Sequence, residues 1–229
     1  MLNQTMIQQR TSHQPAGRPA AANPAALRTL GTSIELMGAP MPFVRNAEIY
    51  GENEPAEYLY KVISGAVRTY KVLNDGRRQI GGFYMPGDIF GLEAGEEHSF
   101  SAEAIVECKV LVIKRSSLIS LASRDTEVAR QLWTMTASEL QRAQDHIMLL
   151  VKTAQERVAG FLLEMAGRGA SGTEIELPMS RQDIADYLGL TIETVSRTLT
   201  QLENSAAIAV PTSRRIVLRN RAALNRLNA

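Results

Sequence analysis

The stretch SRQDIADYLGLTIETVSRTLTQLE, residues 180–203, has the start and stop signals of two helices in close succession. Ser180 and Asp183 form a Ser-x-x-Asp variant of the capping box, which begins a helix. Gly189 favours the positive φ angle with which a helix ends, and Thr191 can cap the helix that follows. Two helices joined by a turn of about three residues have the spacing of a helix-turn-helix. The side chains expected to bury the first helix are Ile184, Ala185 and Leu188.

The second helix, residues 192–203, has two unlike sides when its residues are placed about 100° apart. Arg197 can donate two hydrogen bonds to guanine, and Glu193 can accept one from cytosine or, less ideally, from adenine. An ordinary i,i+4 ion pair between Glu193 and Arg197, worth roughly 0.3–0.5 kcal/mol, is the alternative. Base reading is favoured because the pair lies in the first turns of the second helix of a capped motif. The residues expected to face inward are Val195, Leu199 and Leu202, and those expected to read bases are Ile192, Glu193, Ser196 and Arg197.

A hairpin is predicted after the second helix, with strands over 207–210 and 215–218 and a turn at 211–213, which is the wing of a winged helix. Residues 179–229 contain seven arginines and four acidic residues, whereas the whole chain has a net charge of only +1. Concentrated positive charge favours contacts to phosphates, which make binding salt-dependent but carry no sequence information. The residues expected to contact phosphates are Arg181, Thr191, Thr200 and Arg214 or Arg215; arginines 219, 221 and 226 have the alternative role of keeping the domain soluble.

Length and composition limit the class of protein. A chain of 229 residues exceeds the usual single domain of about 100–150 residues, so two domains are expected. No apolar run approaches the roughly 18 residues of a spanning helix and the N-terminus lacks a signal peptide's apolar core, so no membrane partner is expected. The single cysteine, Cys108, cannot form an internal disulfide or a four-thiolate iron–sulfur or zinc site, which favours the cytoplasm. Residues 1–25 lack periodicity and are expected to form a flexible tail.

Residues 26–125 have the pattern of an antiparallel β-domain, with short apolar runs separated by glycines. Tyr58, Tyr60 and Val62 alternate as one face of a strand, and Asn-Asp-Gly at residues 74–76 is a hairpin turn signal. Glycine turns about eight to fourteen residues apart predict a small jelly roll or barrel. Such a β-roll can hold a ligand or be filled by its own side chains.

Residues 126–151 predict one long helix with a seam of apolar or small residues at alternating spacings of three and four. An uncharged heptad seam is typical of a helix that packs against the same helix of a second chain, so a homodimer is expected. Packing of the helix only against its own β-domain is the alternative, and Leu132, Met135 and Leu149 on a neighbouring stripe are expected to pack there as well. Residues 152–229 form the predicted DNA-binding domain. The seam consists of Trp133, Thr136, Leu140, Ala143, Ile147 and Leu150.

Three segments, GDIFG (87–91), ERVAGFLLEM (156–165) and residues 180–203, resemble the Crp/Fnr superfamily of bacterial transcription regulators, most of all its FixK branch. The resemblance covers nearly the whole chain after the tail. It implies an α+β fold with an N-terminal β-roll (jelly roll) of the cyclic-nucleotide-binding type, a long dimerisation helix and a C-terminal winged helix-turn-helix.

The resemblance also implies a function. Glu193, Ser196 and Arg197 match the E-x-x-S-R triad of the Fnr type, which implies a two-fold double-stranded DNA site similar to TTGAT-N4-ATCAA, or the looser TTG-N8-CAA. Family members usually activate transcription from a bound dimer by touching RNA polymerase, for which the loop 167–173 and exposed turns of the β-roll are candidates here. Regulators of the FixK branch act in microaerobic and nitrogen-oxide metabolism or nitrogen fixation.

The chain departs from the family where other members bind a cofactor. Cyclic-nucleotide members hold the phosphate with a glutamate soon after a glycine and with a later arginine; here Leu92 follows Gly91, and Phe100 stands where the arginine is expected. A phosphate would therefore lack a guanidinium partner. Oxygen-sensing members use an N-terminal cysteine cluster, and the first 30 residues contain no cysteine. We therefore expect DNA binding without a cofactor or metal.

An effector-gated regulator with haem or another small molecule in the β-roll is the alternative, because His98, His146 and Cys108 are possible axial ligands. Without an effector, the protein would be controlled through its concentration, or by oxidation of Cys108, which burial in a strand would make inert. A cysteine at position 180 would act as a redox switch, but the chain has Ser180 there.

An enzyme on a cupin-like roll needs two or three histidines and a carboxylate around a metal. The three histidines lie in the tail, a loop and a helix, so enzymatic activity is not expected.

Overall fold

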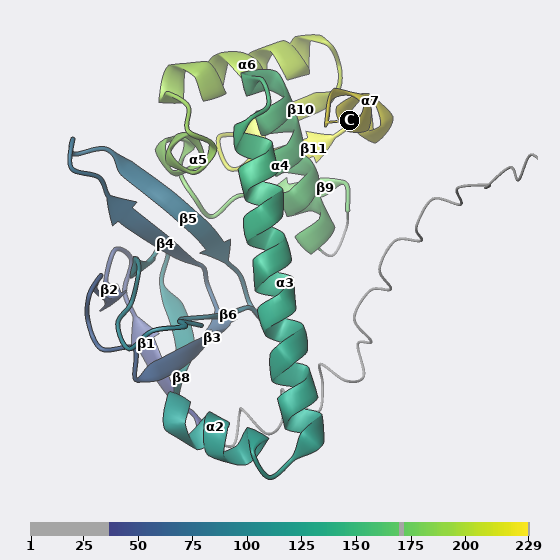
Figure 1. Ribbon diagram of the computed structural model, residues 1–229. Helices are drawn as coiled ribbons and strands as arrows, with labels where there is room; N and C mark the ends of the chain where they lie inside the picture. Colours follow the sequence, from purple (N-terminus) through teal and green to yellow (C-terminus); the bar gives the residue numbers. More distant parts are fainter. Residues whose placement is uncertain (1–36, 170–171, 229) are drawn as a thin grey trace, which may run out of the picture.

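The structure, a computed structural model, describes residues 37–169 and 172–228; the expected tail lies outside these residues. A β-roll lies beside a long helix, α3, and a mainly helical C-terminal part sits at the far end of that helix (Figure 1). The described part of the β-roll forms two four-stranded antiparallel sheets. One sheet has the order β1-β8-β3-β6 (Ala39–Phe43, Cys108–Lys114, Tyr58–Ser64, Ile89–Phe90) and the other β2-β7-β4-β5 (Glu48–Tyr50, Ser101–Ala104, Val67–Val72, Arg78–Tyr84).

Glycine turns connect successive strands of the β-roll, as expected. Gly76 closes the β4–β5 hairpin with a φ of +83°, and Gly65 joins β3 to β4 with a φ of +80°. A side chain at Gly65 would also collide with Cys108, because its Cβ would lie 2.5 Å from the Cys108 Cβ. Both positions therefore require glycine.

Tyr58, Tyr60 and Val62 lie at alternate positions of β3, as expected, but they differ in burial. Tyr60 and Val62 are buried, but Tyr58 is exposed because it pairs with Lys114, the last residue of β8, at the end of the sheet. Leu59 is buried on the opposite side of the strand, in a cluster beneath the helices. The strand is therefore covered on both faces, and strict alternation does not describe it.

Two helices follow the β-roll. The first, α2 (Arg115–Ala122), was not predicted, and the second, α3 (Thr126–Leu150), agrees with the predicted long helix to within one residue. Asp125 begins α3 by accepting hydrogen bonds from the amides of Glu127 and Val128. Leu132 and Met135 pack on the cluster that also holds Leu59, as expected, whereas Leu149 is buried in another core, which the β-roll shares with the C-terminal part.

The described residues of the C-terminal part form four helices and a small sheet of order β10-β11-β9. Its elements are α4 (Ala154–Arg168), β9 (Glu174–Glu176), α5 (Arg181–Leu188), α6 (Ile192–Asn204), β10 (Ile208–Thr212), β11 (Arg215–Leu218) and α7 (Arg221–Asn228). The strand β9 and the helix α7 were not predicted. Among the described residues, no helix is long and apolar enough to span a membrane.

The predicted wing is present, but its turn begins two residues later than predicted. Thr212 pairs with Arg215, so the turn is made by residues 213–214 and not by 211–213. Pro211 lies inside β10, where the pairing register shifts between Ala209 and Thr212. Proline lacks an amide donor and is tolerated in a strand at such an irregularity, so the turn signal was misleading.

Ala206 connects α6 to the wing with a φ of +55°, a left-handed conformation that costs a residue with a Cβ about 1–2 kcal/mol. Its side chain is exposed, so no packing depends on it. We expect Ala206→Gly to raise the free energy of unfolding by about 0.5–1 kcal/mol, measured by urea denaturation. The control Ala222→Gly, at an exposed site in α7, should lower it by about the same amount. A loss of stability in Ala206→Gly would contradict the assigned conformation.

Candidate nucleic-acid interface

The helix-turn-helix has the predicted caps. The Ser180 hydroxyl accepts a hydrogen bond from the Asp183 amide at 3.1 Å, and the Asp183 carboxylate accepts one from the Ser180 amide at 2.9 Å. Gly189 ends α5 with a φ of +61°. The Thr191 hydroxyl accepts from the Thr194 amide at 3.2 Å and begins α6. These local features fix where α5 begins and ends and where α6 begins.

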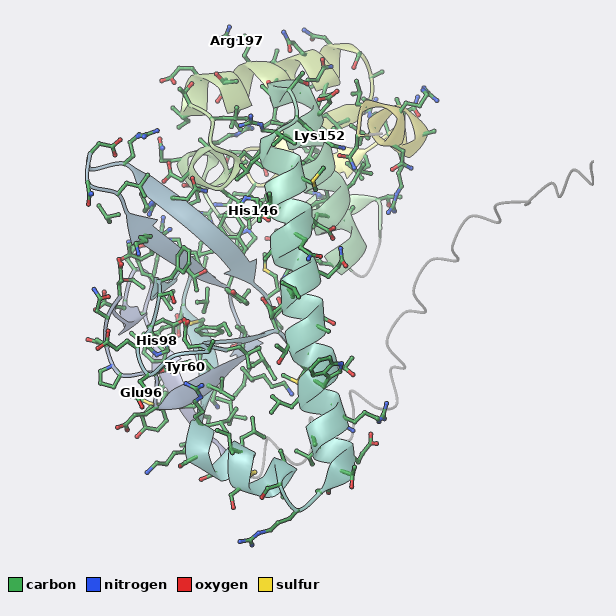
Figure 2. All side chains as sticks on the ribbon, viewed as in Figure 1. Tyr60, Glu96, His98, His146, Lys152 and Arg197 are labelled. Carbon is green, nitrogen blue, oxygen red and sulfur yellow. The ribbon has the colours of Figure 1, made fainter. Side chains whose placement is uncertain are left out.

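The two sides of α6 lie as predicted. Val195, Leu199 and Leu202 are buried in the core that α6 shares with α4 and α5. The polar side is exposed, and Figure 2 shows Arg197 at the outer edge of the molecule, pointing away from it. The exposed residues are Ile192, Glu193, Ser196, Arg197 and Thr200. The structure therefore gathers the predicted base-reading residues on one open face.

Glu193 is held as a hydrogen-bond acceptor at the start of α6. The pKa of its carboxyl lies below the usual range because it accepts hydrogen bonds from its own backbone amide and from Thr191. The attraction of Arg197 is the smallest of these effects. Glu193 is therefore ionised at neutral pH and can accept hydrogen bonds.

The predicted phosphate-contacting residues differ in their surroundings. Arg214 is exposed in the turn of the wing, and Arg181 is half-buried, with its pKa lowered by burial. The Arg215 guanidinium forms an ion pair with Glu174 of β9, which engages it across the small sheet. The Thr200 hydroxyl donates to the Ser196 carbonyl at 3.1 Å. Arg214 is thus the more accessible of the two wing arginines for a phosphate.

The predicted seam of α3 is left uncovered by the rest of the described chain. Trp133, Leu140 and Ile147 are 76%, 60% and 61% exposed. Large apolar side chains repeated along one helix face mark an interaction surface. Thr136 and Ala143 are exposed and Leu150 is half-buried. Sequence reasoning missed the exposed apolar side chains of Met148 and Val151 at the end of the same helix.

The interior of the β-roll does not fit a cyclic nucleotide. The stacked or tilted rings of Tyr50, Tyr60 and Phe90, with centroids 5.1–6.1 Å apart, fill it. The cavity beside them holds about 100 Å³, below the roughly 300–1,000 Å³ of ligand pockets, and Glu93 and Glu139 line it. Phe100 also lines this cavity and packs against Gly81. A phosphate placed there would lie beside carboxylates and aromatic rings. The lining of this cavity therefore does not suit a cyclic nucleotide.

The three possible haem ligands do not converge. Cys108 is buried in β8, and His146 lies on α3, where its Nε2 is hydrogen-bonded to the Tyr187 carbonyl oxygen at 2.8 Å. His98 is stacked on Tyr50 with ring centroids 3.6 Å apart, and burial lowers its pKa (Figure 2). Within the described part of the chain, no three His, Cys, Asp or Glu side chains gather to hold a metal ion.

Cys108 is 3% exposed, and burial raises the pKa of its thiol. A raised pKa lowers the thiolate fraction at neutral pH, and the thiolate is the form that reacts. We expect the folded protein to react with an aromatic disulfide reagent about a hundredfold or more slowly than the urea-unfolded chain. Cys108→Ala carrying Ser138→Cys, at an exposed site of α3, is the control and should react rapidly when folded. Equal rates for Cys108 in the folded and unfolded protein would restore the redox hypothesis.

Two protein families match the two parts of this architecture. The cyclic nucleotide-binding domain matches residues 40–125, and the Crp-like helix-turn-helix domain matches residues 156–227. The chain belongs to the Crp/Fnr family of transcription regulators, with a Crp-like β-sandwich followed by a DNA-binding helix-turn-helix domain.

Within that family, the chain is similar to FixK proteins. The nitrogen fixation regulation protein FixK of Azorhizobium caulinodans is 54% identical over 202 residues, which are 86% of this chain and 82% of that protein. FixK of Rhizobium meliloti is 43% identical over 181 residues, covering 79% and 82%. The solved structure of FixK2 from Bradyrhizobium japonicum has a TM-score of 0.81 at 56% identity and covers 84% of this chain and 98% of that one. These relatives are transcription regulators and not enzymes, which agrees with the expected class and fold.

Proposed function

We propose that this protein is a dimeric, sequence-specific activator that binds a two-fold site similar to TTGAT-N4-ATCAA, or the looser TTG-N8-CAA. The observation that carries the proposal is the open face of α6, where Glu193, Ser196 and Arg197 are exposed in the first turns of a helix held by caps at both ends of the turn. Arg197 reads guanine, Glu193 reads the exocyclic amine of cytosine, and Ile192 touches a thymine methyl. Arg181, Arg214 or Arg215, and the hydroxyls of Thr191 and Thr200 contact phosphates.

The exposed seam of α3 supports the dimer. Regulators of the Crp/Fnr family are dimeric, and a two-fold DNA site mirrors a two-fold protein. Pairing α3 with its copy covers Trp133, Leu140 and Ile147, which water would otherwise surround. The dimer then presents one α6 from each subunit to successive major grooves.

The β-roll is filled by side chains, which supports DNA binding without a cyclic nucleotide. The proposed regulator does not use an iron–sulfur cluster either. Control then acts through the concentration of the protein in the cytoplasm. The FixK relatives are named nitrogen fixation regulation proteins, and we propose a related role here, in nitrogen-fixation or microaerobic gene control. RNA polymerase is the proposed partner at the promoter. Its candidate contacts are turns of the β-roll and the loop 167–173, of which residues 170–171 lie outside the described residues.

An effector-gated regulator is the second candidate, and one observation favours it. Within the described residues, neither ring nitrogen of buried His98 has a hydrogen-bond partner, and Nδ1 lies 3.6 Å from the nearest Glu93 oxygen. A small molecule in the roll would supply that partner.

Fluorescence anisotropy of labelled duplexes with the purified protein, without additives, tests the proposal. We expect tight binding to a TTGAT-N4-ATCAA duplex and weak, salt-sensitive binding to a duplex with both TTG elements scrambled. An absorption spectrum of the same sample serves as a control for haem. A Soret band, or binding that requires an added metabolite, would favour the effector-gated regulator.

A further inference from the structure

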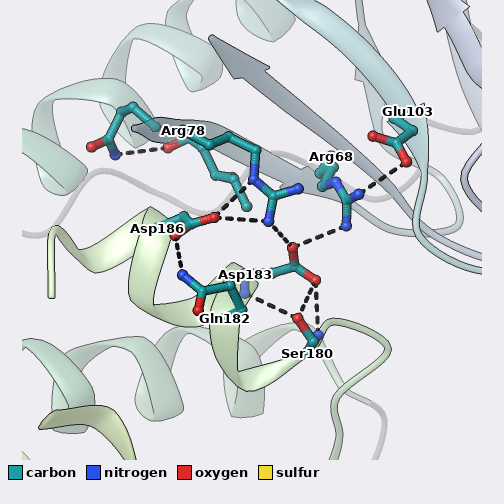
Figure 3. Close-up of polar contacts among 9 residues, drawn as sticks. Arg68, Arg78, Glu103, Ser180, Gln182, Asp183 and Asp186 are labelled. Atoms are coloured by element: carbon teal, nitrogen blue, oxygen red, sulfur yellow. Dashed lines mark hydrogen bonds and ion pairs between the residues drawn. The ribbon is translucent and has the colours of Figure 1, made fainter. Parts of the chain in front are cut away.

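The first helix of the helix-turn-helix is bound to the β-roll by buried charges. The β4–β5 hairpin lies against α5 (Figure 1), and the polar contacts between them are drawn in Figure 3. Asp183 is 3% exposed. Its Oδ1 accepts from Arg68 Nη1 at 2.9 Å and from Arg78 Nη2 at 2.6 Å, while its Oδ2 accepts from the amide and hydroxyl of Ser180. One carboxylate therefore caps α5 and joins it to two strands.

Both arginines have a second anchor. Arg68 of β4 is buried, and its Nη2 lies 3.0 Å from Glu103 Oε1 on the neighbouring strand β7. Arg78 of β5 donates from Nε to Asp186 Oδ2 at 2.8 Å, one turn along α5 from Asp183. We call Arg68, Arg78, Asp183 and Asp186 the arginine latch.

The latch specifies one orientation of α5 on the sheet. If α5 slid or rotated while remaining packed on the sheet, Asp183 and Arg68 would stay buried but lose their partners, and unpaired buried charges are strongly unfavourable. Two parallel contacts one helical turn apart also resist rotation of α5 about its own axis. The main effect of the latch is therefore to fix the orientation of α5 on the sheet, and its contribution to the stability of the whole protein is smaller.

Aromatic contacts beside the latch hold the same helix from two further sides. Tyr187 of α5 packs on Phe83 of β5 with ring centroids 5.1 Å apart and is stacked on His146 of α3 at 4.0 Å. Ile80 and Phe83 of the roll belong to the same apolar core as α4, α5 and α6. The helix-turn-helix is therefore packed against both the β-roll and α3.

We propose that Arg68 and Arg78 are positioning residues for DNA recognition, acting through Asp183 and Asp186 from outside the DNA-binding domain. In the dimer, the pairing of the two α3 helices fixes how the subunits are arranged, and the latch fixes the position of each α6 relative to α3. The two α6 helices are then spaced for successive major grooves without a bound ligand. This inference rests on the proposed function. A protein that spends only a fraction of its time in the competent orientation loses apparent affinity by that fraction.

Charge-removing variants of the full-length protein test the latch. We expect Arg78→Gln and Arg68→Gln to weaken operator binding by about tenfold or more, because the competent population falls. Arg77→Gln removes the same charge one residue away, where Arg77 pairs only locally with exposed Asp75, and should bind as the unmodified protein does. Since no phosphate contact is lost, the dependence of affinity on salt should keep its slope. A slope reduced by about two, one for each subunit of the dimer, would show that the arginine contacts DNA directly and would overturn the proposal.

Hydrogen exchange without DNA separates this proposal from the proposed function. The amides of α5 should exchange faster in Arg78→Gln than in Arg77→Gln, while thermal melting shows that both full-length variants fold. Arg78→Lys, which keeps the charge, should recover part of the operator affinity. If Arg68→Gln prevents folding, Asp186→Asn, which weakens the pairing of Arg78 with Asp186 and leaves the contacts of Asp183 in place, replaces it. Unchanged exchange and affinity in the Arg78 and Asp186 variants would overturn the latch; failure of the unmodified protein to bind any duplex would overturn the proposed function instead.

Discussion

Replacing Arg197 with alanine is expected to abolish discrimination at one guanine in each half-site. Arg197 is exposed and points away from the molecule, so its removal leaves the fold and the dimer intact (Figure 2). A bidentate arginine–guanine contact is worth about 1–3 kcal/mol of discrimination. Because the symmetric operator has two half-sites, we expect the variant to lose about 2–6 kcal/mol of discrimination free energy on it, measured by anisotropy.

The matched control is Arg226→Ala, which removes the same charge from an exposed position on α7. It should lower affinity for all duplexes slightly and equally. Operators in which each candidate guanine is replaced in turn locate the contact. If Arg197→Ala kept the full operator preference of the unmodified protein, the assignment of base reading to α6 would be wrong.

The substitution Leu140→Glu is expected to separate the subunits. Leu140 is at the middle of the exposed seam, so in a dimer two carboxylates would meet near the axis and both leucine contacts would be lost. Losing a buried leucine costs about 2–5 kcal/mol per copy, so we expect the dimerisation constant to fall by about a thousandfold or more. Operator affinity should fall with it, because a single subunit holds only one half-site.

Light scattering reports the mass of the variant in solution, and anisotropy reports its DNA binding. Ser138→Glu, which places the same charge on α3 away from the seam, is the control and should remain paired. A Leu140→Glu protein that stays dimeric and binds the operator normally would show that the subunits meet elsewhere. The exposed apolar residues of α3 would then need another partner.

The helix-turn-helix could be predicted because its signals are local. Ser180, Gly189 and Thr191 act on neighbours within three or four residues, so the sequence contains nearly all of the relevant geometry. The same holds for the β4–β5 hairpin and for the long helix α3. Weak local signals explain the errors: β9 has only three residues, and Pro211 suggested a turn inside a strand.

The arginine latch could not be predicted because its partners are far apart in the sequence. Asp183 has a complete local role as the third residue of a capping box, and nothing in the sequence indicates a second one. Arg68 and Arg78 lie 115 and 105 residues away, in strands where charged side chains ordinarily face water. Their burial follows from the docking of α5 on the hairpin, which a one-dimensional pattern does not encode. The sequence likewise did not decide whether the β-roll holds a ligand or is filled by its own side chains, so its aromatic interior could not be predicted.

Selection of random DNA duplexes by the purified protein without additives, followed by sequencing, tests the central claim most directly. We predict enrichment of one two-fold consensus, with TTG and CAA at its ends and half-site centres about ten base pairs apart. The Arg197→Ala protein should lose the guanine preference in the same experiment. Recovery of no motif, of a single unpaired half-site, or of a motif only after a small molecule is added would contradict the account.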